Sequence, residues 1–220
     1  MGKPRIVSEA RRTPVTREPP MKRLVGPHEW LSSESRRTYD RTLSSARPFK
    51  MYLSREAECA IRQQAESGAV ERLEVMGLLL GEVRKWEEEQ YAVVLGIGTT
   101  DLESTNAKVR FECDALPKLF ADLDRASFDY VIVGWYHSHP GHTCFMSKID
   151  LRTQRTIFDQ PYHTALVIDT LNREIKAFKL SGDDYAESAF AMFDAPLQDG
   201  PAKRTRKLRT ASSQSHPQMP

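Results

Sequence analysis

Two histidines, one aspartate and one glutamate carry the clearest chemical signal in this sequence. His137 and His139 are separated by a single residue, Asp150 follows in the same region, and Glu74 lies far upstream. Two imidazoles and one carboxylate can hold a catalytic zinc ion and leave its fourth position open for the attacking water. Such a water needs a general base, and the carboxylate of Glu74 fits that role. Together these residues indicate a hydrolytic site with one zinc ion per chain.

The elements around these residues must bring them together. An apolar stretch that ends at His137 predicts a buried strand, and because strand side chains alternate, His137 and His139 project to the same side. Ser147 and Asp150 fit the N-cap and the third position of a helix. An ordinary capping pair explains both of them as well. However, the short loop at residues 140–146 would return the helix start to the strand end, where Asp150 could meet both imidazoles.

The remaining pattern predicts a single α/β domain over residues 48–194, with a mixed central sheet flanked by helices. Strands are expected at residues 74–83, 91–98, 130–137, 164–169 and 174–180. Helices are expected at residues 54–67, 114–125, 147–158 and 184–193, and a loop at residues 99–108.

Two basic segments flank this domain. Residues 1–47 have a charge balance of +6 and residues 195–220 one of +4, while the whole chain has +2, so the body between them is acidic. Neither segment has apolar residues that recur at a helix or strand spacing, which predicts disordered tails. Trp30 and Leu31 interrupt the first segment, either as a pair that docks on a partner or as a solvated pair. Nucleic acid is not an expected partner, because the tails lack the interleaved aromatic residues that often bind it.

The cysteines and the apolar runs bear on the cellular compartment. Three cysteines, Cys59, Cys113 and Cys144, are odd in number and form no C-x-x-C pair, so no disulfide framework is expected. No apolar run approaches the roughly 20 residues of a membrane-spanning helix, and no secretory signal is recognisable. We therefore expect a cytoplasmic protein with no membrane partner.

The order and spacing of the candidate residues resemble the JAMM (MPN+) family of zinc metalloproteases. The signature of that family is an upstream Glu, then H-[ST]-H-P, seven residues, Ser, two residues and Asp. This chain matches it with Glu74, His137 to Pro140, Ser147 and Asp150. The blocks at residues 73–81 and 134–144 are similar to those of the proteasome-lid deubiquitinase and the signalosome deneddylase. The resemblance covers roughly residues 50–180 and implies a single MPN (cytidine-deaminase-like) domain.

The resemblance further implies a deubiquitinase-like isopeptidase. Zinc is expected on His137, His139 and Asp150, with Glu74 as general acid and base. Ser147 is expected to donate a hydrogen bond to the oxyanion. The substrate would be the bond after the C-terminal Gly-Gly of ubiquitin or a ubiquitin-like modifier in its conjugates, and the proteasome is a further expected partner.

Substrate-binding residues are expected in the loop after His139 and in a movable flap. Gly141, Cys144 and Phe145 are candidates for the substrate path, although Cys144 is more typical of packing than of a nucleophile. Similar enzymes have Trp in place of Phe145 and Gly in place of Thr143. Residues 99–111 are the candidate flap that pairs with the modifier tail, with a plain surface loop as the alternative.

Two other readings of the same residues remain. Two histidines and a carboxylate also form the ligand set of non-haem iron oxygenases. A non-catalytic MPN scaffold that binds a ubiquitin-like protein or a proteasome-like complex is the other alternative, since some domains of this fold only bind partners.

Overall fold

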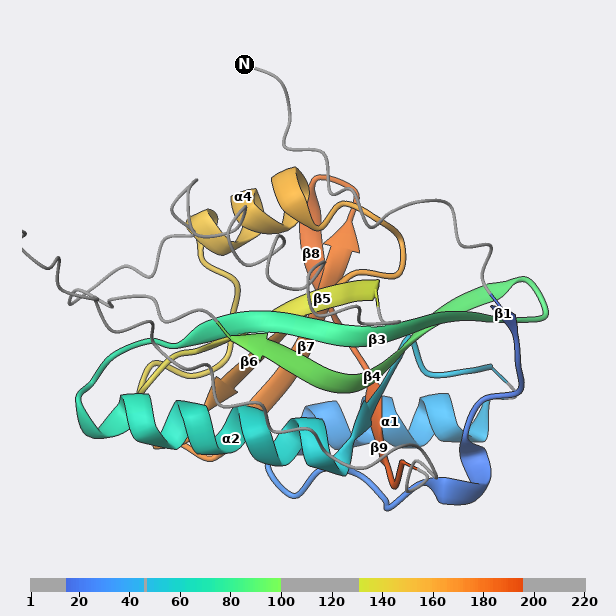
Figure 1. The fold of residues 1–220 in the computed structure, drawn as a ribbon, viewed down its shortest axis with the longest axis horizontal. Helices are drawn as coiled ribbons and strands as arrows, with labels where there is room; N and C mark the ends of the chain where they lie inside the picture. The colour runs from blue at the N-terminus through green and yellow to red at the C-terminus, as the bar shows by residue number, and fades with distance from the viewer. Residues whose placement is uncertain (1–14, 46, 100–130, 196–220) are drawn as a thin grey trace, which may run out of the picture.

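The computed structural model describes residues 15–45, 47–99 and 131–195 (Figure 1). These residues form a nine-stranded mixed sheet of order β8-β7-β6-β5-β3-β4-β2-β9, with β1 paired to β3. The strands are β1 Val15–Thr16, β2 Met51–Ser54, β3 Met76–Trp86, β4 Glu89–Thr99, β5 Val131–Ser138, β6 Thr164–Asp169, β7 Glu174–Ser181, β8 Asp184–Ser188 and β9 Phe190–Phe193. The helices are α1 Ser33–Ser44, α2 Arg55–Val70 and α4 Lys148–Ile157, and Met21–Arg23 forms the 3-10 helix η1.

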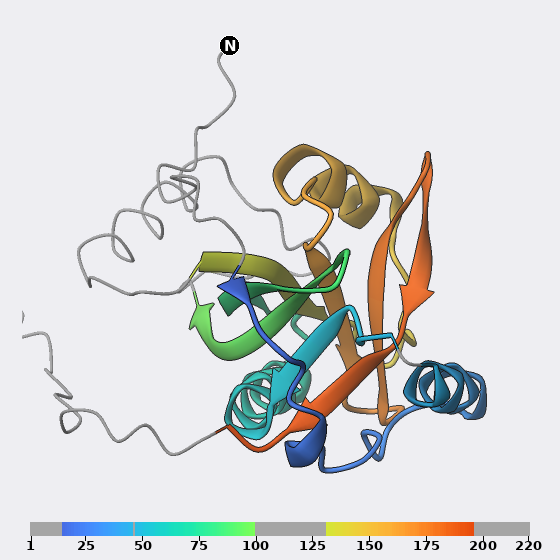
Figure 2. The same ribbon diagram turned by 90° about the vertical axis from the view of Figure 1, so that its right-hand side faces the viewer.

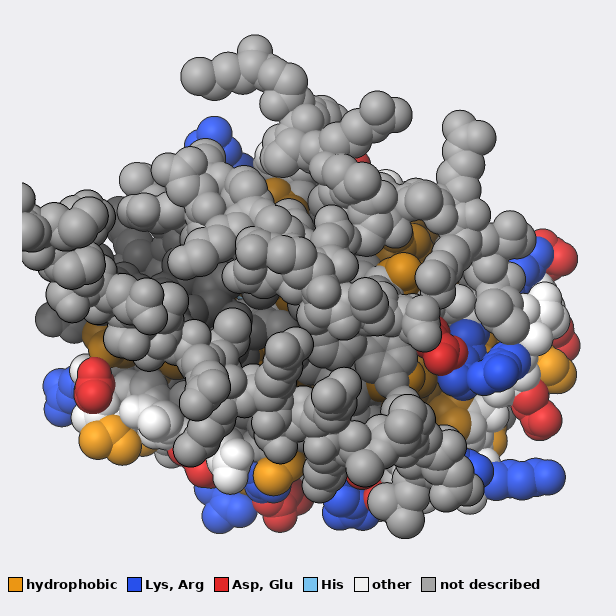
Figure 3. Space-filling model, in the orientation of Figure 1, with side chains coloured by type: hydrophobic (Ala, Val, Ile, Leu, Met, Phe, Trp, Pro, Cys, Tyr) orange, Lys and Arg blue, Asp and Glu red, His pale blue; other side chains and the backbone are white. Residues whose placement is uncertain are grey.

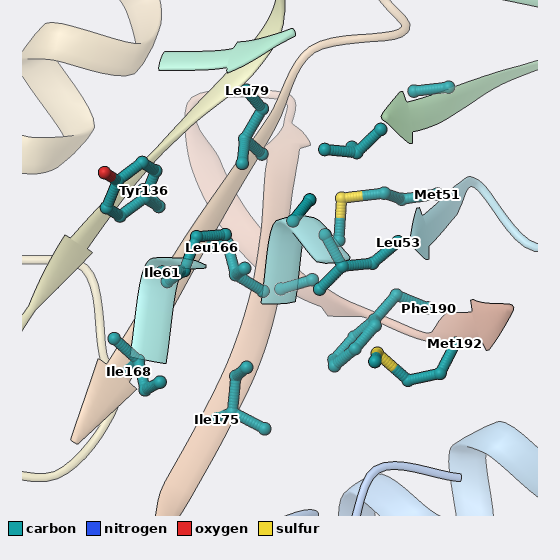
Figure 4. Packing of buried hydrophobic residues seen from close by; sticks show 14 of the residues in the cluster. Met51, Leu53, Ile61, Leu79, Tyr136, Leu166, Ile168, Ile175, Phe190 and Met192 are labelled. Carbon is teal, nitrogen blue, oxygen red and sulfur yellow. The ribbon is translucent and has the colours of Figure 1, made fainter. Parts of the chain in front are cut away.

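The sheet is covered on both faces, with α4 on one side and α2 on the other (Figure 1). Alternate residues of one strand therefore enter different hydrophobic clusters. Leu79 of β3 packs with Ile61 of α2 and Leu166 of β6 (Figure 4). The neighbouring Leu78 belongs to the second cluster, which lies towards α4 and contains Phe158. Burial on both faces explains the continuous apolar runs of the central strands.

Most of the predicted elements are confirmed. The helix expected at residues 54–67 is α2, and its N-cap Ser54 accepts a hydrogen bond from Ala57 N–H at 3.2 Å. The strand at residues 164–169 is β6, and the other four predicted strands correspond to β3, β4, β5 and β7. The helix at residues 147–158 is α4, capped by Ser147. The single α/β domain with a mixed sheet is thus confirmed.

The helix predicted at residues 184–193 is wrong, because this segment forms β8 and β9. Ser181 pairs with Asp184 across a two-residue turn in which Gly182 has a φ of +59°, and β8 continues from there antiparallel to β7. A Gly-Asp pair between two short strands is a hairpin signal. β9 then pairs in parallel with β2, about 140 residues upstream, and all of its residues are buried. The local hairpin with β7 and the pairing with the distant β2 together outweigh the weak local tendency to form a helix.

The disorder predicted for residues 1–47 is also wrong for the described part of that segment. Residues 15–45 run from β1 through η1 to α1 along the edge of the domain (Figure 2). Trp30 packs into the core on the α2 side, and the Tyr39 ring lies 4.9 Å from the Phe49 ring. Widely spaced aromatic residues produce no periodic pattern, yet each one fills a site that distant strands and helices create. The domain therefore begins well before residue 48.

Several expectations fall outside the described residues, namely the helix at 114–125, the loop at 99–108 and the flap at 99–111 beyond their first residue, and the tail after residue 195. None of the described helices is both long and apolar enough to cross a membrane. Basic and acidic side chains of the described residues alternate along the margin of the face in Figure 3.

Candidate metal centre

The end of β5 and the start of α4 bring three potential ligands together. His137 Nε2 and His139 Nε2 lie 3.1 Å apart, and Asp150 Oδ2 lies 3.5 Å from the first and 3.8 Å from the second. Both histidines are buried, and Asp150 is only partly accessible. Within the described part of the chain, this is the one group of three such side chains with converging ligand atoms. The prediction that these three residues meet is confirmed.

The spacing of the three atoms suits a zinc ion. Ligands about 2.0–2.1 Å from a tetrahedral zinc lie about 3.3 Å from one another. The three distances of 3.1, 3.5 and 3.8 Å scatter around that value. Two imidazole nitrogens and one carboxylate oxygen are also the donor types that zinc accepts, with one position left for water. The residues present therefore fit zinc.

Asp150 combines the capping role and the ligand position that the sequence left as alternatives. Asp150 Oδ2 accepts a hydrogen bond from Ser147 N–H at 2.7 Å, and Ser147 Oγ accepts one from Asp150 N–H at 3.2 Å. This reciprocal pair is a capping box, which fixes the side chain at the first turn of α4. The same Oδ2 faces both imidazoles. The cap thus holds the carboxylate where it faces the two imidazoles, so that capping and metal binding do not exclude each other.

The two imidazoles are held in different ways. His139 Nδ1 lies 3.1 Å from the Thr143 carbonyl oxygen, and because a carbonyl only accepts, Nδ1 carries the proton and Nε2 keeps a lone pair. The His137 ring instead stacks on the Trp135 indole at 4.5 Å with an interplanar angle of 12°. His137 Nδ1 is buried and has no hydrogen-bond partner among the described residues. Trp135 Nε1 donates to Gln154 Oε1 at 2.7 Å, which links this stack to α4.

The electrostatics of the site favour the protonation states that a metal requires. Burial and the neighbouring His137 lower the pKa of His139 to about 4, so that its ring is neutral at pH 7. Burial alone would raise the pKa of Asp150, but His137 and the Ser147 hydrogen bonds outweigh it and bring this pKa to about 2. A neutral imidazole beside an ionised carboxylate is the ligand form that binds a divalent cation.

Glu74 lies directly before β3, on a segment that Ser138 anchors to β5, the strand at whose end both histidines lie. Val75 N–H donates to Ser138 Oγ at 2.9 Å, and Ser138 N–H donates to the Val75 carbonyl oxygen at 2.9 Å. Gly68 in α2 permits this close packing, because a Cβ there would lie 2.6 Å from Val75 Cγ1. The side chain between the two histidines therefore positions the segment that carries Glu74.

The environment of Glu74 suits proton transfer. Glu74 is half-buried, and burial raises its pKa, with the Asp150 carboxylate adding to the increase. The nearby imidazoles of His137 and His142 oppose it. A carboxylate whose pKa moves towards neutrality is a better general base and acid than an unperturbed one. Glu74 thus lies within electrostatic reach of the metal-ligand group, as the sequence predicts.

The three candidate substrate-binding residues differ in their exposure. Phe145 is 42% exposed, and its ring lies 4.7 Å from the His139 ring. Gly141 is exposed and has a φ of +82°, which favours glycine. Cys144, in contrast, is buried, and its thiol donates towards the carbonyl oxygens of Val167 and Glu174. The structure therefore corrects the placement of Cys144 in the substrate path, and burial raises the pKa of its thiol, as expected of a packing residue.

Sequence reasoning missed the polar residues that support the site from β5, α4 and the β6–β7 turn. Besides Ser138 and Gln154, they are two carboxylates: Asp169 accepts hydrogen bonds from the loop after His139, and Glu174 Oε2 accepts one from Cys144 N–H at 2.7 Å. Burial alone would raise the pKa of Asp169, but hydrogen bonds from three backbone amides and the Asn172 side chain lower it. An Asp that ends a strand before a turn is a weak signal in sequence, because it more often caps its own turn.

Comparison with known proteins finds a family match over the segment that contains Glu74, His137, His139, Ser147 and Asp150. A family described as "JAB1/Mov34/MPN/PAD-1 ubiquitin protease" matches residues 50–159. COP9 signalosome complex subunit 5 of Debaryomyces hansenii is 32% identical over 165 residues, which cover 66% of this chain and 34% of that protein. Ubiquitin carboxyl-terminal hydrolase RPN11 of Saccharomyces cerevisiae is 35% identical over 98 residues, which cover 44% of this chain and 30% of that protein. The chain spans about a third of the length of these relatives.

A solved structure also resembles this chain. The solution structure of protein DSY2949 from Desulfitobacterium hafniense covers 66% of this chain and 94% of its own, with a TM-score of 0.46 and 21% identity. This likeness is too low to support a functional argument.

Proposed function

Because the chain belongs to the JAB1/Mov34/MPN/PAD-1 ubiquitin protease family, we propose that it is a zinc-dependent isopeptidase. Its reaction is hydrolysis of the bond after the C-terminal Gly-Gly of ubiquitin or a ubiquitin-like modifier. The observation that carries this proposal is the convergence of His137, His139 and Asp150 beside the half-buried Glu74. These three side chains would hold one zinc ion per chain. Zinc, when bound, supplies a Lewis acid that lowers the pKa of water to about 7.

The residues of the chain have separate tasks in this reaction. Glu74 takes a proton from the attacking water and returns it to the leaving amine, and its raised pKa suits both steps. Ser147 uses its hydroxyl oxygen as an acceptor in the helix cap, which leaves its O–H proton able to donate to the substrate carbonyl oxygen as charge develops there. The positive N-terminal end of α4 stabilises the same charge.

The names of the relatives support the choice of substrate. One of them is called a ubiquitin carboxyl-terminal hydrolase, and another is a subunit of the COP9 signalosome. A Gly-Gly terminus also makes physical sense, since it has no side chains and can lie extended beside the Phe145 ring next to the metal ligands. The proposed partners are thus a ubiquitin-like modifier and its conjugates, in the cytoplasm.

The test is cleavage of ubiquitin-like proteins that carry a C-terminal fusion after Gly-Gly. We expect cleavage after the second glycine by the wild type, loss of cleavage after chelation, and recovery with added zinc. Glu74→Gln should lower kcat about 10²–10⁴-fold while zinc remains bound. Glu71→Gln, an exposed glutamate three residues away, is the matched control and should keep full activity. A folded protein with one zinc per chain that cleaves none of these fusions would contradict the proposal and favour the non-catalytic scaffold.

A further inference from the structure

Asp169, the last residue of β6, is a buried carboxylate that faces the loop following His139. Its side chain has no exposed surface. Asp169 Oδ1 accepts hydrogen bonds from Gly141 N–H at 3.0 Å, Leu171 N–H at 3.0 Å and Asn172 N–H at 3.1 Å. Asp169 Oδ2 accepts hydrogen bonds from Thr143 N–H at 2.8 Å and the Asn172 side-chain amide at 2.7 Å. One carboxylate thus joins the β6–β7 turn to two residues of the loop.

The loop residue held by Oδ2 has an unfavourable backbone conformation. Thr143 has a φ of +64°, a left-handed value that is rare for a β-branched side chain and persists only when the surroundings enforce it. The hydrogen bond from Thr143 N–H to Asp169 is such a restraint. The adjacent Cys144 N–H is held in turn by Glu174. The backbone at 143–144 is therefore fixed by two carboxylates on the β6–β7 hairpin.

The same residue determines how one metal ligand points. The Thr143 carbonyl oxygen lies 3.1 Å from His139 Nδ1, so the conformation of Thr143 decides whether that nitrogen keeps its proton and its orientation. The opposite nitrogen, His139 Nε2, is the one that faces His137 Nε2 and Asp150. A chain of contacts runs from Asp169 through Thr143 to the ligand atom of His139.

We propose that Asp169 is a positioning residue of the metal centre. By holding Thr143 N–H, it keeps the Thr143 carbonyl on His139 Nδ1 and presents the unprotonated Nε2 to the metal before the metal binds. This inference rests on the proposed zinc site. Asp169 acts through Thr143 and not by contact with the ligand atoms. It affects metal affinity and the tautomer of the His139 ring, and it takes no part in a step of the reaction.

Asp169→Asn tests this role because it breaks one arm of the carboxylate selectively. With the amide oxygen in the place of Oδ1, the hydrogen bonds from Gly141, Leu171 and Asn172 remain. The amide nitrogen then faces Thr143 N–H, and two donors oppose each other. The Asn172 side chain can turn its oxygen towards the new donor, whereas a backbone N–H has no such freedom. The variant therefore loses mainly the contact with Thr143.

The expected result is a zinc dissociation constant raised about 10–100-fold, measured by competition with a chromophoric chelator. In the metal-free variant, ring-nitrogen NMR of His139 should show a mixture of tautomers, where the wild type shows the Nδ1-protonated form alone. Asn172→Ala is the matched control: it removes the other hydrogen bond to Oδ2 and should leave the zinc dissociation constant within about twofold and the tautomer unchanged. An Asp169→Asn variant that equals the wild type in both measurements would overturn the proposal.

A double variant separates positioning from a general loss of structure. Glycine adopts a positive φ without strain, so Thr143→Gly should keep the loop in place with a weaker restraint. Adding Thr143→Gly to Asp169→Asn should recover part of the lost zinc affinity. If Asp169 served only the stability of the fold, Thr143→Gly would leave the zinc affinity of Asp169→Asn as low as before.

The wild type itself provides a test that does not depend on the folding of any variant. The metal-free protein should already hold His139 in the Nδ1-protonated form and protect Thr143 N–H from hydrogen exchange. A metal-free protein in which His139 samples both tautomers and Thr143 N–H exchanges freely would overturn the proposal. Failure of the wild type to bind zinc at all would instead contradict the proposed function.

Discussion

Two buried clusters of this protein combine histidine with a carboxylate, and they differ in what the ring nitrogens meet. In the first, His28 Nδ1 accepts Trp30 N–H at 3.0 Å and Nε2 lies 3.1 Å from Glu58 Oε1, so both nitrogens are matched by the protein. In the second, His137 Nε2 and His139 Nε2 face each other and Asp150 at distances of 3.1 to 3.8 Å. Burial and residue type are alike in the two clusters.

The difference shows how a structural histidine can be told from a ligand. Glu58 in the first cluster also pairs with Arg62 at 3.3 Å, so its charge is balanced within the protein. The candidate metal centre brings two imidazole nitrogens and an anionic oxygen together, and no Lys or Arg of the described residues pairs with Asp150 there. Buried polar groups are normally paired, and a convergence of acceptors is costly unless a cation joins them. The functional site is therefore indicated by ligand atoms that converge without a basic partner, and not by burial alone.

The largest expected effect comes from making the same His→Ala substitution in each of the two clusters. His139→Ala removes a ligand and should raise the zinc dissociation constant by more than about 100-fold, with loss of all detectable cleavage, since even supporting residues are worth about 10–100-fold. His28→Ala should leave zinc affinity and cleavage unchanged. It should lower the free energy of unfolding by about 1–3 kcal/mol, because Trp30 N–H and Glu58 lose a buried partner.

Chelator competition and urea unfolding measure the two quantities on the same pair of variants. A His28→Ala variant that loses zinc as strongly as His139→Ala would erase the distinction between the clusters.

Ser147 allows the cap and the chemistry within the metal centre to be separated. Ser147→Ala should lower kcat about 10²–10³-fold through loss of a donor to the oxyanion. Loss of the N-cap should cost only about 1 kcal/mol of unfolding free energy. Ser54→Ala, which removes the N-cap of α2, should show the second effect without the first. Equal kcat values for the two variants would restrict Ser147 to a capping role.

A smaller effect is expected from acid in the metal-free protein. The pKa of His139 is about 4 in the folded state because of burial and the nearby His137, against about 6.5 in an unfolded chain. Between these values the unfolded state binds more protons, so this contribution to stability is complete above pH 6.5 and is lost as the pH falls towards 4. The wild type should therefore lose about 2 kcal/mol more than His139→Gln between pH 7 and 4.5. Urea unfolding with chelator at several pH values measures this difference, and parallel curves for the two proteins would contradict it.

Much of the site follows from local rules that act between near neighbours in the sequence. His137 and His139 share one side of β5 because side chains alternate along a strand. Ser147 and Asp150 meet because a capping box joins the N-cap to the third residue of a helix. The start of α2 and the burial of the central strands likewise follow from local patterns, an N-cap and continuous apolar runs. The hairpin at Gly182 also has a local signal, a Gly-Asp pair between two short strands, and this signal favours β8 over the predicted helix.

Other features depend on residues that lie far apart in the sequence. Trp30 is buried because Arg62 and Arg173 place their guanidinium groups 5.5 and 5.7 Å from its ring centre, and strands from the rest of the chain complete its pocket. No pattern within residues 15–45 reveals that pocket.

By itself, the sequence determined the ligand types, their order and their local geometry, because backbone periodicity and capping act over a few residues. Only the tertiary structure decided that Ser138 anchors the segment of Glu74, that Asp169 reaches Thr143, and that residues 190–193 pair with β2. These contacts join elements about 26 to 140 residues apart, and their partners become neighbours only when the sheet has assembled.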